Sequence, residues 1–326
     1  MIKLFAAELD RLRSRRVFLI GLAVLFLALV GFQVAVGFAV KQPSQAEIAQ
    51  ARTQFQQAQQ EYRDNKDENE QAQKDCEKQM GPAHASDCAI SEPSWEDYRP
   101  RPATFADMAG GVVTVSVILP TLAFLIIGAS SIGAEYGSGA IANWLSFIPD
   151  RLKVYVSKLG TLLLTGAIVT AAATALSLAS TAVLVKINSG SVTKLGDLIA
   201  EGGRGLLIVT FGAAVGFALA LIFRHTVAAL GVVLGYLVVD FVLNILMGSI
   251  ESMQKLKPWL VENNLLAVLH NGYPYYDQRK EVTSDGIMYN QVERHLSLGH
   301  GIIYLAVLFV AAVLISAVIF RRRDVT

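Results

Sequence analysis

The sequence lacks the short motifs that carry most enzyme chemistry. It has no G-x-x-x-x-G-K-[ST] loop for nucleotide phosphates, no G-x-S-x-G elbow for a serine nucleophile and no H-E-x-x-H helix for zinc. The five histidines are scattered, and His295 and His300 are five residues apart, so they do not share a helix face. We therefore expect no catalytic residue, no metal and no cofactor bound by this chain, and no enzyme activity of its own.

Charge is also scarce. Charged residues make up 17% of the 326 residues, whereas 53% are hydrophobic, and the mean hydropathy is +0.45. One soluble core cannot absorb so much apolar surface, so a lipid-facing surface is expected. The formal net charge of +1 carries no signal for nucleic acid, and no nucleic acid is predicted as a partner.

Long apolar runs are the main feature that is present. A bilayer core about 30 Å thick takes roughly 20 residues of helix to cross. The first run is too long for the apolar region of a typical signal peptide, so we interpret it as a retained anchor. The runs predict an all-α integral membrane protein with six transmembrane helices, at residues 17–40, 111–133, 159–185, 205–223, 226–248 and 301–320.

The distribution of positive charge predicts the orientation. One side of the membrane receives 12 of the 28 lysines and arginines in 49 residues, and the other receives 16 in 141 residues. Because positive charge accumulates on the cytosolic side, both termini are expected in the cytosol. The cytosolic pieces are then the leader 1–16, the segment 134–158, the turn Arg224-His225 and the tail 321–326.

The segment 41–110 is predicted to be an external helical domain. Between residues 46 and 76 it is rich in Gln, Glu, Lys and Ala. Its apolar residues recur every three or four positions, which indicates a helix with one apolar seam. This seam either packs against its own domain or pairs with another subunit. The seam consists of Ile48, Ala51, Phe55, Ala58 and Tyr62.

Cys76 and Cys88 are the only cysteines and lie in this same external segment. A disulfide between them is expected, which fits an oxidising compartment. His84 lies between them, but two thiols and one imidazole leave a zinc ion one ligand short, so no metal is predicted.

Three other segments outside the spans carry weaker signals. The leader 1–16 has Ile2, Phe5, Leu9 and Leu12 at helical spacing, which predicts an amphipathic helix in the membrane interface. The external segment 186–204 is expected to be a loop. The external loop 249–300 contains a short apolar run flanked by aromatic residues, and this pattern favours interfacial or re-entrant helices.

Asp240 lies in the middle of the fifth span, four residues before Asn244. A charged residue there costs about 2.5 to 3.5 kcal/mol on insertion scales, so it is expected to face protein or water, or to be protonated. Asp240 and Asn244 either line a path or subunit interface, or form a hydrogen bond to a neighbouring helix. The pairs Gly212 with Gly216 and Gly231 with Gly235 favour close helix packing in spans four and five.

The cytosolic segment 134–158 is the most informative stretch. Glu135 directly follows the second span, Gly137 and Gly139 loosen the backbone, and residues 143–148 favour a short helix that ends at Pro149. A compact helix held between two spans gives a cytosolic partner a way to tilt both.

This order of features resembles the ABC type-2 (ABC-2) exporter permeases. The resemblance rests on an amphipathic leader, a first span, a large external segment, and a second span that ends in an Ala-Glu-Tyr-x-x-Gly pattern. The six-span layout and the final Arg323-Asp324-Val325 extend the match. Family members commonly have threonine where this chain has Ala140. The pattern residues here are Ala134, Glu135, Tyr136, Gly139, Leu145, Pro149, Arg151 and Lys158.

The resemblance implies a membrane-spanning permease subunit of an ABC exporter in a bacterial plasma membrane. Two nucleotide-binding ATPase subunits would bind ATP and Mg, and a second permease chain, identical or homologous, would pair with this one among the membrane lipids. The resemblance also implies which residues couple transport to the ATPase subunit: Glu135, Tyr136, Gly139, Leu145, Pro149 and Arg151.

Two other function classes compete with this interpretation. The chain could be a non-transporting membrane sensor or scaffold that presents the segment 41–110, although one or two spans suffice for an anchor. A secondary transporter driven through Asp240 is less favoured because no internal repeat is evident.

Overall fold

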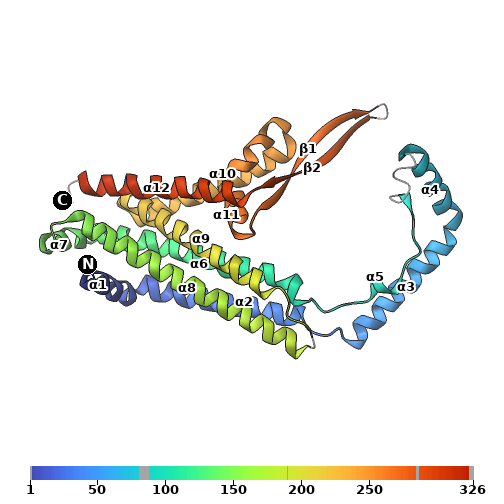
Figure 1. The fold of residues 1–326 in the computed structure, drawn as a ribbon, viewed down its shortest axis with the longest axis horizontal. Helices are drawn as coiled ribbons and strands as arrows, with labels where there is room; N and C mark the ends of the chain where they lie inside the picture. Colours follow the sequence, from blue (N-terminus) through green and yellow to red (C-terminus); the bar gives the residue numbers. More distant parts are fainter. Residues whose placement is uncertain (1, 81–87, 189, 284–285, 323–326) are drawn as a thin grey trace.

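The computed structural model describes residues 2–80, 88–188, 190–283 and 286–322 (Figure 1). His84 and the C-terminal Arg323-Asp324-Val325 lie outside the described residues. The helices are α1 (Ile2–Ser14), α2 (Arg16–Ala39), α3 (Gln45–Asp64), α4 (Lys66–Met80), α5 (Trp95–Tyr98), α6 (Phe105–Gly137), α7 (Ala140–Phe147), α8 (Arg151–Ile187), α9 (Leu195–Phe223), α10 (Thr226–Ser249), the 3-10 helix η2 (Glu251–Trp259), α11 (Val261–Leu269) and α12 (Leu298–Arg322).

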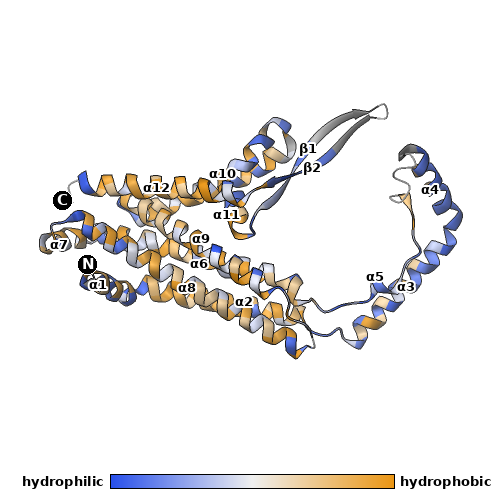
Figure 2. Ribbon diagram, viewed as in Figure 1, coloured by the Kyte–Doolittle hydropathy of each residue, from blue (hydrophilic) through white to orange (hydrophobic). Residues whose placement is uncertain are grey.

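Six of these helices are long and apolar enough to cross a membrane, which confirms the predicted all-α class with six spans. They are α2, α6, α8, α9, α10 and α12. In Figure 2 hydrophobic residues dominate the ribbons of the bundle, whereas those of α3 and α4 are largely hydrophilic. Both described ends of the chain lie at the same end of the bundle as α7 (Figure 1).

Two of the spans extend well beyond their apolar runs because polar residues cap them. Thr104 and Asp107 form a capping box that starts α6 at Phe105, six residues before the apolar run. The side chain of Asp150 accepts a hydrogen bond from the Lys153 backbone and starts α8 at Arg151. As a result α8 is 37 residues long, and α6 has 33 residues with the buried Pro120 near its midpoint.

The core of the bundle is formed by α6, α8 and α9. About half of the apolar window of α6 and 61% of that of α9 is buried, whereas only 11% is buried in each of α2, α10 and α12. The outer helices therefore turn most of their apolar surface away from the protein, as expected of helices that face lipid or another chain.

Close approach between α6 and α9 depends on small residues. A β-carbon at Gly216 would collide with the backbone carbonyl oxygen of Leu125, which cannot move aside cheaply. The predicted close packing is therefore confirmed for span four. By contrast, a β-carbon at Gly231 or Gly235 would meet no described atom within 4 Å, so the second glycine pair packs against nothing in the described part of this chain.

The external segment folds into an arm that projects from the end of the bundle opposite α7 (Figure 1). Phe55 of the apolar seam on α3 packs against Trp95 and Tyr98 of α5, with ring centroids 5.7 Å apart in both cases. At Phe55 the seam thus contacts its own domain. Cys76 and Cys88 form the predicted disulfide.

A β-hairpin was not predicted. The strands β1 (Tyr273–Thr283) and β2 (Gly286–Leu296) pair antiparallel, with Tyr273 opposite Leu296. The expectation of interfacial or re-entrant helices in 249–300 therefore covers only η2 and α11, and more than a third of that loop is strand instead. The hairpin projects at the same end of the bundle as the arm (Figure 1).

We expect Gly216→Ala to lower the free energy of unfolding by about 1–3 kcal/mol, because the added methyl overpacks the contact with α6. Gly31→Ala in α2 is the matched control, since a β-carbon at that position would meet no described atom within 4 Å. Thermal unfolding of the purified chain in detergent measures both variants. Equal midpoints for the two would contradict a tight α6–α9 contact.

Candidate functional site

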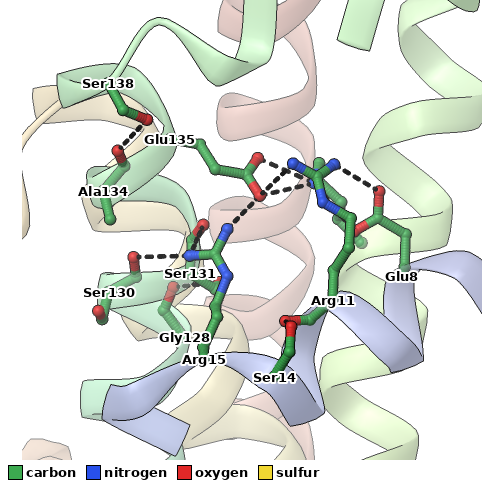
Figure 3. A network of polar contacts seen from close by, with 11 residues as sticks. Glu8, Arg11, Ser14, Arg15, Gly128, Ser130, Ser131, Ala134, Glu135 and Ser138 are labelled. Atoms are coloured by element: carbon green, nitrogen blue, oxygen red, sulfur yellow. Dashed lines mark hydrogen bonds and ion pairs between the residues drawn. The ribbon is translucent and has the colours of Figure 1, made fainter.

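A buried network of charged side chains lies at the α7 end of the bundle (Figure 3). It joins two carboxylates to three cations and involves three helices and the residue between α1 and α2. The carboxylates are Glu8 of α1 and Glu135 of α6, and the cations are Arg11 of α1, Arg15, and Lys158 of α8.

Glu135 is the centre of this network. Lys158 Nζ lies 2.9 Å from Glu135 Oε2 and 2.9 Å from Glu8 Oε2, so one ammonium bridges α6 and α1. Arg11 Nη2 lies 3.7 Å from Glu135 Oε1, and Arg15 Nη2 donates a hydrogen bond to the same oxygen.

Local structure places each of these groups. Arg15 is the extended residue between α1 and α2, and its Nη1 also donates to the carbonyl oxygen of Ser131 at 3.0 Å. Ser131 and Glu135 are four residues apart, so they lie on the same face of α6. Lys158 lies about two turns into α8, which brings its long side chain toward that face.

The network is largely closed to solvent. The side chains of Glu8, Glu135 and Lys158 are only 4–6% exposed. Buried charges need opposite charges and hydrogen bonds, and removing one partner of such a pair typically costs about 3–5 kcal/mol. The five groups carry a formal charge of +1, from three cations and two carboxylates.

The segment between α6 and α8 is a short helix on a tight turn. Gly139 has φ +69°, a left-handed conformation that side chains disfavour, and α7 follows immediately. Ile141 is buried and Leu145 packs against the core of the bundle, whereas Phe147 is 81% exposed. Pro149 then separates α7 from α8.

Contacts tie this short helix and its neighbours to the rest of the bundle. The guanidinium of Arg11 lies 4.7 Å from the ring centre of Trp144 in α7, which joins α7 to the charged network. The guanidinium of Arg224, in the turn between α9 and α10, lies 5.6 Å from the ring centre of Tyr136.

The six predicted coupling residues are not gathered at one point. Glu135 enters the network, Tyr136 faces the α9–α10 turn, and Arg151 Nη1 donates to the carbonyl oxygen of Phe320 near the end of α12 at 3.4 Å. Gly139, Leu145 and Pro149 shape α7 and its turns. Together they lie on α7 and on the ends of α6 and α8 that flank it, but they make separate contacts.

Sequence reasoning missed the partners of Glu135. Glu8 and Arg11 are spaced i, i+3 on the leader, which predicts a shared helix face. In the sequence Arg15 is one of several basic residues of the leader 1–16, and Lys158 has no role beyond its place in the family pattern. The available signal was a lone acidic residue at the end of a span, which requires nearby cations if it is buried.

Asp240 and Asn244 form a separate polar cluster in the half of α10 that leads toward η2. Asp240 is buried and accepts hydrogen bonds from Tyr236 Oη and Asn244 Nδ2, both at 3.3 Å. Asn244 Nδ2 also lies 3.0 Å from Glu262 Oε1 of α11. The polar groups therefore join α10 to its own next turn and to α11.

Among the described residues, no group of three or more His, Cys, Asp or Glu could hold a metal ion.

The contact between α10 and α11 is expected to depend on pH. Burial, together with a hydrogen bond to Asp240, raises the pKa of Glu262 above its ordinary value of 4.5. A raised folded-state pKa stabilises the fold below the unfolded value, and this contribution is lost as the pH rises through the folded-state pKa.

Protonation of Glu262 is therefore expected to raise the thermal midpoint of the purified chain as the pH is lowered from neutral toward 4.5. Glu262→Gln lacks this contribution because the amide does not titrate, so the difference in midpoint between the two chains changes across this range. Midpoints across this range measure the effect, with exposed Glu70→Gln as the matched control. A pH profile unchanged by Glu262→Gln would contradict the assignment.

Breaking the charged network is expected to destabilise the chain strongly. Glu135→Gln leaves the network at +2 and lowers the free energy of unfolding by about 3 kcal/mol. Adding Lys158→Gln restores +1 and recovers part of this loss. Chemical unfolding of the single and double variants measures the coupling.

Lys153→Gln is the control, because its ion pair with Asp150 is exposed and worth at most about 1 kcal/mol. If Glu135→Gln and Lys153→Gln had equal effects, the network would not be an energetic centre of the fold.

Comparison with known proteins supplies the family. No curated protein and no solved structure matches the chain significantly. The profile described as "ABC-2 family transporter protein" matches residues 4–325, nearly the whole chain. This match covers the charged network, α7 and all six spans. The chain therefore belongs to the ABC-2 transporter family, as a multi-pass membrane protein of the kind that forms the non-catalytic permease subunit of an ABC transporter.

Proposed function

We propose that this chain is the permease subunit of an exporter, which moves a substrate out of the cytosol or the inner leaflet of a bacterial plasma membrane. Both termini and α7 lie in the cytosol in this proposal. A separate nucleotide-binding subunit, present in two copies, binds ATP and Mg and hydrolyses the ATP. The observation that carries the proposal is α7 itself, a short helix with an exposed aromatic side chain held between two core spans.

The surface of α7 fits a docking role. One side of the helix is anchored, because Ile141 is buried and Leu145 packs against the core. The other side presents Phe147, which is 81% exposed at the end of the bundle. An exposed aromatic side chain beside anchored ones is typical of a residue that fills a pocket on a partner protein.

The contacts of α7 support transmission of movement into the membrane. Gly139 and Pro149 join α7 to α6 and α8 by short connections, and Arg11 links it to the charged network. Glu135 and Lys158 bind the same ends of α6 and α8 to one another. A displacement of α7 therefore acts on both core spans together with α1.

A second permease chain would complete the transporter. The free face of α10 supports this part of the proposal, because Leu234, Val238 and Phe241 are 62–67% exposed and a β-carbon at Gly231 or Gly235 would meet no described atom. Small residues let two helices approach closely in a membrane. A second copy or a homologous chain fits this face.

Phe147→Ser is expected to weaken binding of the ATPase subunit at least tenfold without lowering the thermal stability of the isolated chain, because Phe147 packs on little within it. Losing a central aromatic anchor costs about 2 kcal/mol or more at an interface, which exceeds the roughly 1.4 kcal/mol that corresponds to tenfold. ATP hydrolysis by complexes purified through this chain, together with their intact mass, measures the effect and the subunit count.

Phe38→Ser is the matched control, because Phe38 is 73% exposed and lies one residue before the end of α2 that leads toward the arm. The control is expected to keep full ATPase activity and a mass that corresponds to two permease chains and two ATPase subunits. Complexes in which Phe147→Ser binds the ATPase as tightly as the control would rule out docking through α7. A complete absence of ATPase from the unaltered complex would overturn the permease proposal as a whole.

A further inference from the structure

An open groove lies beside the charged network, between α1, α2 and α8. Its volume is about 440 Å³, within the range of pockets that hold small molecules. Nearly all of its lining is apolar. The residues that line it include Ala6, Leu9 and Arg13 of α1, Leu22 of α2, and Leu164 and Ile168 of α8.

The groove opens sideways toward lipid. Leu164 and Ile168 belong to a membrane span and remain 60% and 59% exposed, so the described part of this chain leaves most of their surface uncovered. They lie within about five turns of the α7 end of α8, in the half of the span nearest that end. The groove is therefore accessible to the acyl chains of one leaflet.

Arg13 is the only charged residue that lines the groove among the described residues. Its side chain is exposed and forms no ion pair or hydrogen bond with any described residue. A guanidinium at the rim of an apolar groove complements a molecule with a phosphate at one end and hydrocarbon at the other.

The helix α1 separates this groove from the charged network. Ala6, Leu9 and Arg13 are spaced by three and four residues and line the groove. Glu8 and Arg11 lie on another face of the same helix and bind Lys158 and Glu135, respectively. A molecule in the groove therefore presses on the helix that supplies two groups to the network.

We propose that the groove binds one anionic phospholipid from the leaflet adjoining α7, with an acyl chain between α1 and α8 and its phosphate on Arg13. The bound lipid holds α1 against α8 and so steadies Glu8 and Arg11 in the network. This second consequence, control of the coupling end by lipid, rests on the proposed permease function. Binding of the lipid itself does not depend on the permease function.

Native mass spectrometry of the full chain in detergent tests the binding. The probes are phosphatidylglycerol and phosphatidylcholine with identical acyl chains. The unaltered chain is expected to bind phosphatidylglycerol more tightly, and Arg13→Gln to lose about fivefold of this affinity, since one basic residue near an anionic lipid contributes about that factor.

Arg16→Gln is the matched control, because Arg16 is also exposed and unpaired among the described residues but does not line the groove. Equal losses for Arg13→Gln and Arg16→Gln would show general attraction to the protein surface and overturn the site. Equal affinity of the unaltered chain for the two lipids would overturn it as well.

Ala6→Trp tests the groove without changing charge, because the indole fills the space for the acyl chain. It is expected to weaken binding of both lipids, whereas Ile20→Trp, on a 61% exposed position outside the groove, is expected to leave binding unchanged. Undiminished binding to Ala6→Trp would exclude the groove. Because no ATPase is present in these measurements, they succeed or fail independently of the permease proposal.

Discussion

The structure depends on the cost of keeping a carboxylate in a protein interior at the membrane boundary. Glu135 is buried at the end of a core span, where an unpaired charge is prohibitive. Cations must therefore come to it from α1, from the residue between α1 and α2, and from α8. This requirement fixes how these elements meet at one end of the bundle, and it ties the leader to α6 and α8.

The same end of the molecule combines rigidity with exposure. The charged network joins the end of α6 to the start of α8, and Ile141 packs α7 against the core, while Phe147 stays exposed. The opposite end has a different character, with a hydrophilic arm closed by one disulfide and a projecting hairpin (Figure 1, Figure 2). The buried charges and the packed short helix are therefore at one end of the bundle, and the extended arm and hairpin are at the other.

Sequence patterns identified the six spans because lipid imposes a length and an apolar composition that few other structures share. They identified Glu135 by its place after a span, but tertiary packing brings in its partners from distant parts of the chain, which no local pattern records. The hairpin was missed because β1 and β2 are polar and carry no regular apolar alternation, although Asp285-Gly286 is a common hairpin dipeptide in sequence. The free glycine pair of α10 and the closely packed pair of α9 look alike in sequence, because the spacing does not specify a neighbour.

The two core spans that flank α7 differ in stiffness. At about 1.5 Å per residue, the 37 residues of α8 form a continuous rod of roughly 55 Å, longer than the hydrocarbon layer is thick. The other rod, α6, contains Pro120 near its middle, which removes a backbone hydrogen bond and offers a place to bend. If α7 docks the ATPase subunit as proposed, a displacement of α7 is carried along the continuous helix α8, whereas α6 can bend at Pro120. Under that proposal, docking at α7 changes the angle between α6 and α8 within the membrane.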